Sequence, residues 1–259
     1  MKNYRGYLLD LDGTIYRGRE VIPGAAAFLA HLRETGVPYL FLTNNSSAPP
    51  EQVAARLQTM GIPAEAEEVY TSAMATAQYL AQVAPAGTPV YVIGEEGVRA
   101  ELTKQGFVLT EKAARYVIVG IDRTFDYEKL TIAARALREG ATLIATNRDA
   151  ALPSEHGLTP GNGSLVAAVS VASGKEPIVI GKPETIIMRL ALDRLGTAVA
   201  ETLIVGDNLY TDIDAGAKSG IDSLLVLTGF SSKEDAAVHP QPPTHIARDL
   251  TEWLRVTTS

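Results

Sequence analysis

The sequence predicts an α/β protein, with a Rossmann-like, doubly wound parallel sheet as its core and an inserted α/β cap domain. Three observations lead to this. Short apolar runs alternate with helical stretches over most of the 259 residues, a pattern typical of a parallel sheet covered by helices. Polar residues follow several of the apolar runs, at the edge where open parallel sheets bind ligands. A long interval separates two of these polar clusters and leaves room for a further domain.

The composition narrows the class of protein. Apolar residues make up 46% of the chain and charged residues 20%, so a packed core is expected. The net charge of −7 argues against nucleic acid as a partner, because such binders present basic faces. The chain has no cysteine and four scattered histidines, which argues against disulfides and zinc. No apolar run reaches membrane-spanning length, so we expect a cytoplasmic protein that has no membrane partner.

The first 60 or so residues already alternate between strand and helix. An apolar run beginning at Tyr7 predicts a buried strand, and a helix follows from Pro23-Gly24 to Gly36. A second strand covers 38–42, and a second helix runs from Pro49-Pro50 to Gly61. This order predicts adjacent parallel strands joined by helical crossovers.

The rest of the chain continues the alternation. Further strands are expected at 90–94, 116–120, 142–145, 177–180, 202–205, 223–227 and near His245. Helices are expected at 96–104, at 127–138, after the turn 160–163, over 186–195 and around Trp253. The chain shows no internal repeat or heptad pattern that would indicate another architecture.

Two acids end the first strand, in the stretch Leu9-Asp10-Leu11-Asp12-Gly13. Because side chains alternate along a strand, Asp10 and Asp12 share one side of it. A cation would relieve the repulsion between them, and hard oxygen ligands suit Mg²⁺. One acid can then act as a nucleophile while the other transfers protons. On its own, the pair could equally be a loop that happens to hold two acids.

Other polar residues follow later strands: Thr43 and Asn44, then Lys182, then Asp207 and Asp212. Together they offer carboxylates for a metal, a hydroxyl and amide N–H groups for phosphate oxygens, and one ammonium. A phosphoryl group uses the whole set, because its transfer requires charge to be neutralised over three oxygens.

Each of these residues also has a structural interpretation. Thr43-Asn44 could cap the next helix, and Lys182 could be a solvated surface lysine. Asp207 could be a loop acid, and Asp212 could complement a helix dipole. Their joint order at the strand ends favours a phosphoryl site over coincidence.

The same residues carry a family resemblance. The chain resembles the haloacid dehalogenase-like hydrolases, and within them the para-nitrophenyl phosphatase or ribonucleotide monophosphatase branch that includes bacterial acid sugar phosphatases. Four ordered motifs carry it: Asp10-Leu11-Asp12-Gly13-Thr14, Leu42-Thr43-Asn44-Asn45, Gly181-Lys182-Pro183, and Gly206-Asp207 with Asp212. The chain departs from the pattern at Asn208 and Tyr210, where relatives often carry Arg and Asp.

The resemblance implies a role for each acid. Asp10 would be the nucleophile that forms an aspartyl-phosphate, and Asp12 would be the general acid and base. Asp10, Asp207 and the backbone carbonyl of Asp12 would bind Mg²⁺. Asp212 would support these ligands without touching the ion.

The resemblance also implies which residues bind the substrate. Thr43 and the Asn44 amide would bind phosphate oxygens, and Lys182 would pair with both the phosphate and Asp10. A homodimer is implied as well.

The cap is located by spacing. Lys182 lies 139 positions after Thr43, whereas one crossover unit takes about 30 residues. We therefore predict a catalytic core at 1–74 and 179–259 and a cap at 75–178 that selects substrates. Its polar loops, with Asn147, Asp149 and Asn162, are candidates for substrate contact, although turn chemistry explains such residues equally well.

The sequence therefore predicts a Mg²⁺-dependent phosphatase that hydrolyses small phosphomonoesters, such as sugar phosphates, under a cap. Two alternatives stay open. A phosphotransferase or phosphomutase would pass the phosphoryl group to a sugar hydroxyl, and a non-catalytic sensor would bind the phosphometabolite without turnover. The acid at Asp12 and the cap-sized insertion argue against the sensor.

Overall fold

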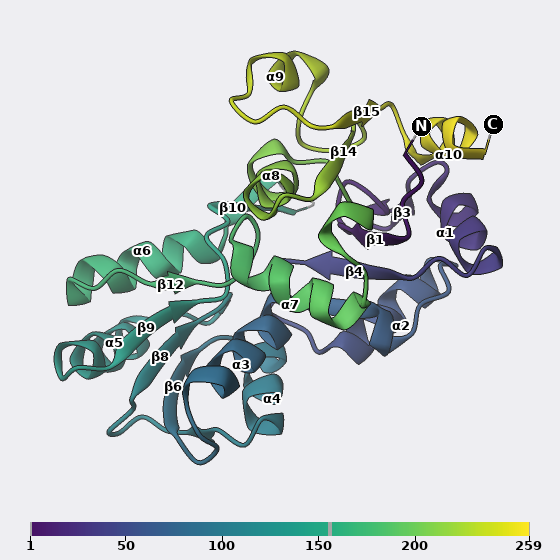
Figure 1. Cartoon of the computed structure of the whole chain (residues 1–259). Helices are drawn as coiled ribbons and strands as arrows, with labels where there is room; N and C mark the ends of the chain where they lie inside the picture. Colours follow the sequence, from purple (N-terminus) through teal and green to yellow (C-terminus); the bar gives the residue numbers. More distant parts are fainter. Residues whose placement is uncertain (1, 155–156, 259) are drawn as a thin grey trace. The chain divides into compact units, whose positions relative to one another are not determined.

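A computed structural model describes residues 2–154 and 157–258 (Figure 1). The chain divides into two compact units. The first, called the core unit below, comprises Met1–Thr43, Ala54–Tyr70 and Lys182–Ser259. The second, called the insert unit, comprises Asn44–Val53 and Thr71–Gly181. The insert unit contains the stretch 75–178, and its action as a cap stays a prediction.

The core unit is built on a six-stranded sheet in the order β15-β14-β13-β1-β4-β5. The strands are β1 (Gly6–Leu9), β4 (Tyr39–Thr43), β5 (Val69–Thr71), β13 (Thr202–Gly206), β14 (Asp222–Val226) and β15 (His245–Ala247). β1 pairs in parallel with β13 on one side and with β4 on the other. All four residues of β1 are buried, as expected for a central strand of a sheet covered on both faces.

Helices complete the core unit: α1 (Ala25–Glu34), α2 (Pro50–Thr59), α7 (Thr185–Leu195), α8 (Asp214–Ser219), α9 (Lys233–Val238) and α10 (Leu250–Thr258). The first four residues of α2 belong to the insert unit. α1 buries Phe28, Leu29 and Leu32, which recur on one helical face. α1 contacts α10, and α7 contacts α8.

The insert unit has its own five-stranded parallel sheet, in the order β12-β9-β8-β6-β7. The strands are β6 (Pro89–Ile93), β7 (Val108–Leu109), β8 (Tyr116–Val119), β9 (Thr142–Ala145) and β12 (Ile178–Val179). Helices α3 (Ser72–Val83) and α4 (Glu96–Lys104) lie together, as do α5 (Tyr127–Arg138) and α6 (Asn162–Ser173) (Figure 1). The core of this unit packs α5 and α6 against the inner strands.

Each sheet has one point where the strand order reverses. In the core unit the chain runs from β1 through β4 to β5, and later from β13 through β14 to β15, so the reversal lies between β1 and β13. In the insert unit it lies between β6 and β8. The crevice outside the carboxyl ends of such neighbouring strands is where open α/β sheets bind ligands.

The predicted fold class is confirmed. The helices expected at 96–104 and 127–138 and the strand expected at 142–145 have those bounds in the structure. The sequence interpretation did not include α3, α9 or the antiparallel hairpins β2–β3 (Tyr16–Arg17, Glu20–Val21) and β10–β11 (Ala151–Ser154, Gly157–Pro160). Among the described residues, no helix combines the length and the apolar character needed to cross a membrane.

Candidate active site

The core unit brings three aspartates together at its strand-order reversal. Asp10 follows β1 and Asp207 follows β13, and the backbone N–H of Asp10 donates to the carbonyl of Val205 over 2.9 Å. Asp212 lies in a π-helical turn, Leu209–Ile213, directly after β13. One carboxylate oxygen from each of these aspartates lies within 4.8 Å of the other two. The parallel strands therefore deliver acids that are far apart in sequence to one place.

Lys182 supplies a positive charge to this cluster. Its Nζ donates to Asp10 Oδ1 and to Asp212 Oδ1, each over 2.6 Å, and to the carbonyl of Leu42 over 3.0 Å. The lysine side chain is only 2% exposed, so its charge acts with little screening by water. When all groups are ionised, three carboxylates face one ammonium, which leaves two negative charges in excess.

The protonation of the cluster reflects burial and crowding. Burial raises the pKa of Asp10 well above its ordinary value, with Lys182 opposing the shift. Burial and the charge of Asp212 raise the pKa of Asp207 to about 7. The pKa of Lys182 is raised because its two acid partners outweigh the effect of burial. The lysine therefore stays charged, while Asp10 and Asp207 resist ionisation.

The acids fit a hard divalent cation. Mg²⁺ prefers carboxylate and carbonyl oxygens, and its charge would offset the excess negative charge of the cluster. The predicted metal ligands Asp10 and Asp207 form one group with Asp212, and metal binding by them stays a prediction. Asp12 is not part of this carboxylate group, so a contribution from its backbone carbonyl stays a prediction.

Asp12 occupies the turn after β1. It forms a bridge to Tyr16, and the Gly13 N–H donates to the Tyr16 carbonyl over 2.8 Å. Its side chain is exposed. Although solvent reaches Asp12, neighbouring atoms remove part of its hydration and raise its pKa, and the positive charges of Arg56 and Arg17 oppose that shift. A carboxyl that holds a proton more readily than usual suits the predicted role of general acid.

The two arginines beside Asp12 were not singled out from the sequence. The Arg56 guanidinium lies 4.8 Å from the centre of the Tyr16 ring and donates to the carbonyl of Gly18 over 3.0 Å. Arg17 donates to the carbonyl of Thr228. Arg17 lies in a short polar passage and Arg56 lies in a helix between Ala55 and Leu57. Neither belongs to a sequence motif, so only the fold reveals their proximity to Asp12.

The predicted phosphate ligands divide between the units. Thr43 is the last residue of β4 and is buried in the core unit, whereas Asn44 is the first residue of the insert unit. The Asn44 side chain donates to both carboxylate oxygens of Asp149, over 3.0 and 3.2 Å. Its carbonyl accepts from Ser72 Oγ over 2.6 Å. Phosphate binding by Thr43 and Asn44 stays a prediction.

The candidate substrate loops of the insert unit are held by internal hydrogen bonds. Asn162 is buried, and its Nδ2 lies within 3.2 Å of three acceptors. Asn147 is also buried; its Nδ2 donates to the Asn44 carbonyl, and its Oδ1 accepts from the Asp149 N–H. These bonds account for the asparagines as loop-forming residues. Substrate contact by Asn147, Asp149 or Asn162 stays a prediction.

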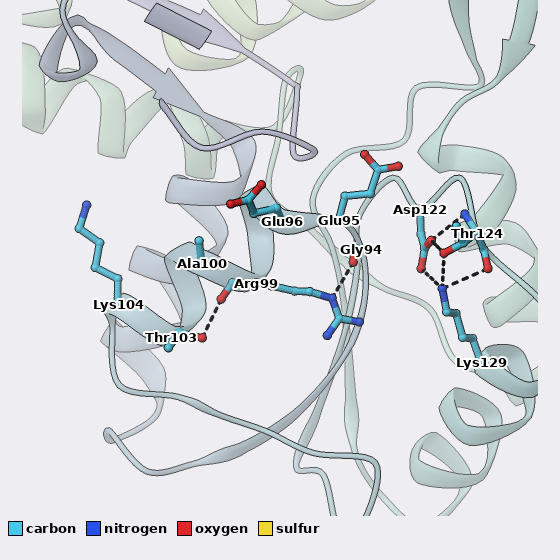
Figure 2. Close-up of a pocket in the computed structure, with 10 residues that line it drawn as sticks. All are labelled: Gly94, Glu95, Glu96, Arg99, Ala100, Thr103, Lys104, Asp122, Thr124 and Lys129. Atoms are coloured by element: carbon cyan, nitrogen blue, oxygen red, sulfur yellow. Dashed lines mark hydrogen bonds and ion pairs between the residues drawn. The ribbon is translucent and has the colours of Figure 1, made fainter. Parts of the chain in front are cut away.

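The insert unit carries a pocket of about 880 Å³ at its own strand-order reversal (Figure 2). Charged side chains line it: Glu95, Glu96, Arg99, Lys104, Asp122 and Lys129. Asp122 accepts from Lys129 Nζ over 2.7 Å and from the hydroxyl and N–H of Thr124, and these groups converge in Figure 2. Burial would raise the pKa of Asp122, but these hydrogen bonds prevail and lower it.

Comparison with known proteins places the chain among phosphatases. The description "Haloacid dehalogenase-like hydrolase" matches residues 7–108, and a related description of the same family matches 179–253. A 5'-nucleotidase, YutF of Bacillus subtilis, is 51% identical over 98% of this chain and 99% of its own. An acid sugar phosphatase of Staphylococcus saprophyticus is 46% identical over 98% of each chain. A crystal structure of thermostable NPPase from Geobacillus stearothermophilus, a double mutant, has a TM-score of 0.92 at 47% identity and covers 98% of this chain and 99% of its own.

Proposed function

The chain belongs to the haloacid dehalogenase-like hydrolases and is a phosphoric monoester hydrolase, and we propose that it cleaves small phosphomonoesters with Mg²⁺ through a phosphorylated Asp10. One observation carries this proposal. Lys182 is fixed between Asp10 and Asp212, with Asp207 beside them, at the reversal point of the core sheet. No other set of described side chains in the core unit joins three acids to a buried lysine.

Asp10 acts as the nucleophile. Its carboxylate attacks phosphorus in line with the departing oxygen, so that the bond from phosphorus to Asp10 forms as the ester bond breaks. Lys182 opposes the effect of burial on the pKa of Asp10 and so favours the ionised, nucleophilic form. The same ammonium lies where it can offset charge on the phosphoryl oxygens.

Asp12 transfers the protons. As the ester breaks, it gives a proton to the leaving oxygen, and it then takes one from the water that attacks the phosphoryl group on Asp10. The second step releases inorganic phosphate and restores both carboxyls. The positive charges of Arg56 and Arg17 limit the rise in the pKa of Asp12, so that its carboxyl can also ionise.

Asp10, Asp207 and the backbone carbonyl of Asp12 would hold Mg²⁺, and the bound ion would supply positive charge to the phosphoryl oxygens. Asp212 keeps Lys182 in place through its Oδ1 and accepts the Asn208 N–H at its Oδ2 over 3.2 Å. Asp212 therefore orients the residues that react rather than reacting itself.

The substrate is a small phosphorylated metabolite. Relatives are named for nucleotides, sugar phosphates and nitrophenyl phosphate, which supports a phosphomonoester without selecting one. Thr43 and the Asn44 amide would hold its phosphate, and the cap at 75–178 would select its organic part. The loops with Asn147, Asp149 and Asn162 are the candidates for that selection, and a homodimer is proposed on the family resemblance.

The proposal is tested with p-nitrophenyl phosphate and Mg²⁺. Purified wild-type protein should release inorganic phosphate, and Asp10→Asn should not. Asp122→Asn is the matched control, because it also removes the charge of an aspartate that pairs with a lysine. Equal phosphate release by the wild type and Asp10→Asn would rule out the nucleophile assignment.

A further inference from the structure

We propose that the loop Thr228–Ser231 is a positioning element that fixes the Asp207 carboxylate for metal binding and ties it to the turn after Asp12. The loop follows β14 and lies in the core unit. The inference rests on the proposed function, because it concerns the metal ligand named there. It adds residues that none of the four sequence motifs contains.

The loop holds Asp207 at both its side chain and its backbone. The N–H of Phe230 donates to Asp207 Oδ2 over 2.6 Å, and the N–H of Ser231 donates to the Asp207 carbonyl over 3.0 Å. A hydrogen bond this short to a charged oxygen is among the stronger ones in proteins. With Oδ2 held and the backbone fixed, rotation of the carboxylate is limited.

The same loop holds the segment that carries Asp212. Ser231 is buried, and its Oγ accepts the N–H of Leu209, the first residue of the π-helical turn, over 3.0 Å. One serine therefore contacts the backbone of both acid-bearing segments. The loop fixes the spacing between Asp207 and Asp212 as well as the orientation of Asp207.

Two glycines make room for the Asp207 carboxylate. A Cβ at Gly229 would lie 1.9 Å from Asp207 Oδ2, and a Cβ at Gly13 would lie 2.4 Å from the same atom. Gly13 also needs its positive φ of 89° for the turn. Gly229 has no such backbone requirement, so the carboxylate itself is what excludes a side chain there.

Thr228 and Arg17 join the loop to the turn after Asp12. Thr228 Oγ1 donates to the carbonyl of Gly13 over 2.6 Å, and Arg17 donates to the carbonyl of Thr228. The segment from Gly13 to Arg17 and the loop therefore exchange hydrogen bonds in both directions. A displacement of the loop would move Asp207 and the turn after Asp12 together.

Changes in this loop should weaken the binding of Mg²⁺. Groups that orient metal ligands typically change affinity by about 10- to 100-fold when they are altered. Gly229→Ala displaces Asp207 and should raise the Mg²⁺ concentration for half-saturation at least about tenfold. Thr228→Val removes one hydroxyl bond and should raise it by roughly two- to fivefold, whereas Thr228→Ser keeps the bond and should match the wild type.

The test is a Mg²⁺ titration followed in two ways: the midpoint of thermal unfolding, and turnover of p-nitrophenyl phosphate. Gly6→Ala is the matched control, since its Cβ would lie 2.6 Å from Thr197 Oγ1, at the opposite end of β1 from Asp10. It should lower the unfolding midpoint without moving the Mg²⁺ half-saturation point. Excess Mg²⁺ should restore most of the kcat of Gly229→Ala, which a general loss of folding would not allow.

Each outcome of the titrations decides the inference. A shifted half-saturation point in Gly229→Ala and Thr228→Val, but not in Thr228→Ser or Gly6→Ala, supports the inference. If Gly229→Ala does not fold, the comparison of Thr228→Val with Thr228→Ser decides alone. Wild-type titration curves in all variants would overturn the positioning role and leave the proposed function intact. A wild type that responds to Mg²⁺ in neither measurement would overturn both.

Discussion

The two sheets of this protein each bring an aspartate and a lysine to the point where their strand order reverses, yet the two pairs differ. In the insert unit, Asp122 accepts from Lys129 and twice from Thr124, and its pKa is lowered. In the core unit, Lys182 is shared between Asp10 and Asp212, and the pKa of Asp10 is raised by burial. Asp122 therefore has a lysine and two further hydrogen-bond donors of its own. Asp10 shares one lysine with Asp212 and lies near Asp207, so the core cluster has more carboxylates than ammonium groups.

The difference shows how the same residue types become structural in one place and reactive in another. An acid with its own ammonium and hydroxyl donors gains little from a further cation. Acids that outnumber their ammonium, inside a site with little water, favour a cation or a proton. Lys129 is 26% exposed and Lys182 is 2% exposed, so the electrostatic interactions are also stronger in the core unit.

The largest expected effect is a difference in kcat between variants of Asp10 and of Asp122. Asp10→Asn removes the nucleophile and should lower kcat on the order of 10⁴-fold, the scale seen when a group that forms the covalent intermediate is lost. Asp122→Asn should change kcat less than about twofold, because its partners lie within the insert unit. Steady-state assays with p-nitrophenyl phosphate measure both. Comparable losses in the two variants would remove the distinction between the sites.

The two lysines should differ in stability. Lys182→Met leaves buried carboxylates without their cation and should lower the free energy of unfolding by about 3–5 kcal/mol at pH 8. Lys129→Met removes a lysine that is 26% exposed, and Thr124 still donates two hydrogen bonds to Asp122, so this variant should cost less, about 1 kcal/mol. Urea unfolding in EDTA measures both differences. If Lys129→Met proves the more damaging, the charge balance assigned to the core unit is wrong.

The free energy of unfolding should depend on pH through the ionisation of Asp207. Because its folded pKa is about 7 and its unfolded pKa is near 4, the folded protein binds more protons between these values. In EDTA, ionisation of Asp207 should therefore lower the free energy of unfolding as pH rises through this window. Asp207→Asn should be the more stable protein at pH 8, by at least about 1 kcal/mol, and the difference should shrink toward pH 4.

Asp122 should show the opposite sign. Its folded pKa is lowered, so its ionised form stabilises the fold above the unfolded pKa of about 4, and that contribution is lost as pH falls through the folded value. Asp122→Asn should cost on the order of 1 kcal/mol at pH 7 and progressively less in acid. Chemical unfolding at a series of pH values measures this, and a cost that grows in acid would contradict the assignment.

The smallest effect is expected at the rim of the insert pocket. Arg123 pairs with Glu95 over 2.6 Å but is 65% exposed, so Arg123→Ala should change the free energy of unfolding by less than about 1 kcal/mol. The kcat should stay at the wild-type value. Urea unfolding at low and high salt would reveal a larger role, since a strong contribution should weaken with salt.

The sequence predicted those parts of the fold that rest on local pattern. Apolar runs located the central strand β1 and its neighbours, because strands buried on both faces have few polar residues. The helix α3 was missed, although Thr71 caps it by accepting the Met74 N–H over 3.1 Å. Its alanine-rich stretch gives only a weak apolar face, so periodicity alone did not reveal it.

The candidate site was predicted only as far as its motifs extend. Asp10, Lys182 and Asp207 follow strands or precede a helix, and topology alone brings such positions to one edge of a sheet. The loop with Gly229 and Phe230 has no comparable signal, because its role depends on a backbone N–H that meets a carboxylate 23 residues away in sequence. Backbone donors of this kind are invisible until the chain is folded.

The most direct test of the account is to look for the phosphoryl group on Asp10. Asp12→Asn should still accept a phosphoryl group from p-nitrophenyl phosphate, whose leaving group needs little protonation, but should lose it slowly without a general base. Protein mixed with this substrate and Mg²⁺, quenched in acid and digested, is analysed by peptide mass spectrometry. The account predicts one phosphoryl group on the peptide that contains Asp10. Steady turnover with that peptide unmodified, or with the phosphoryl group on another residue, would contradict it.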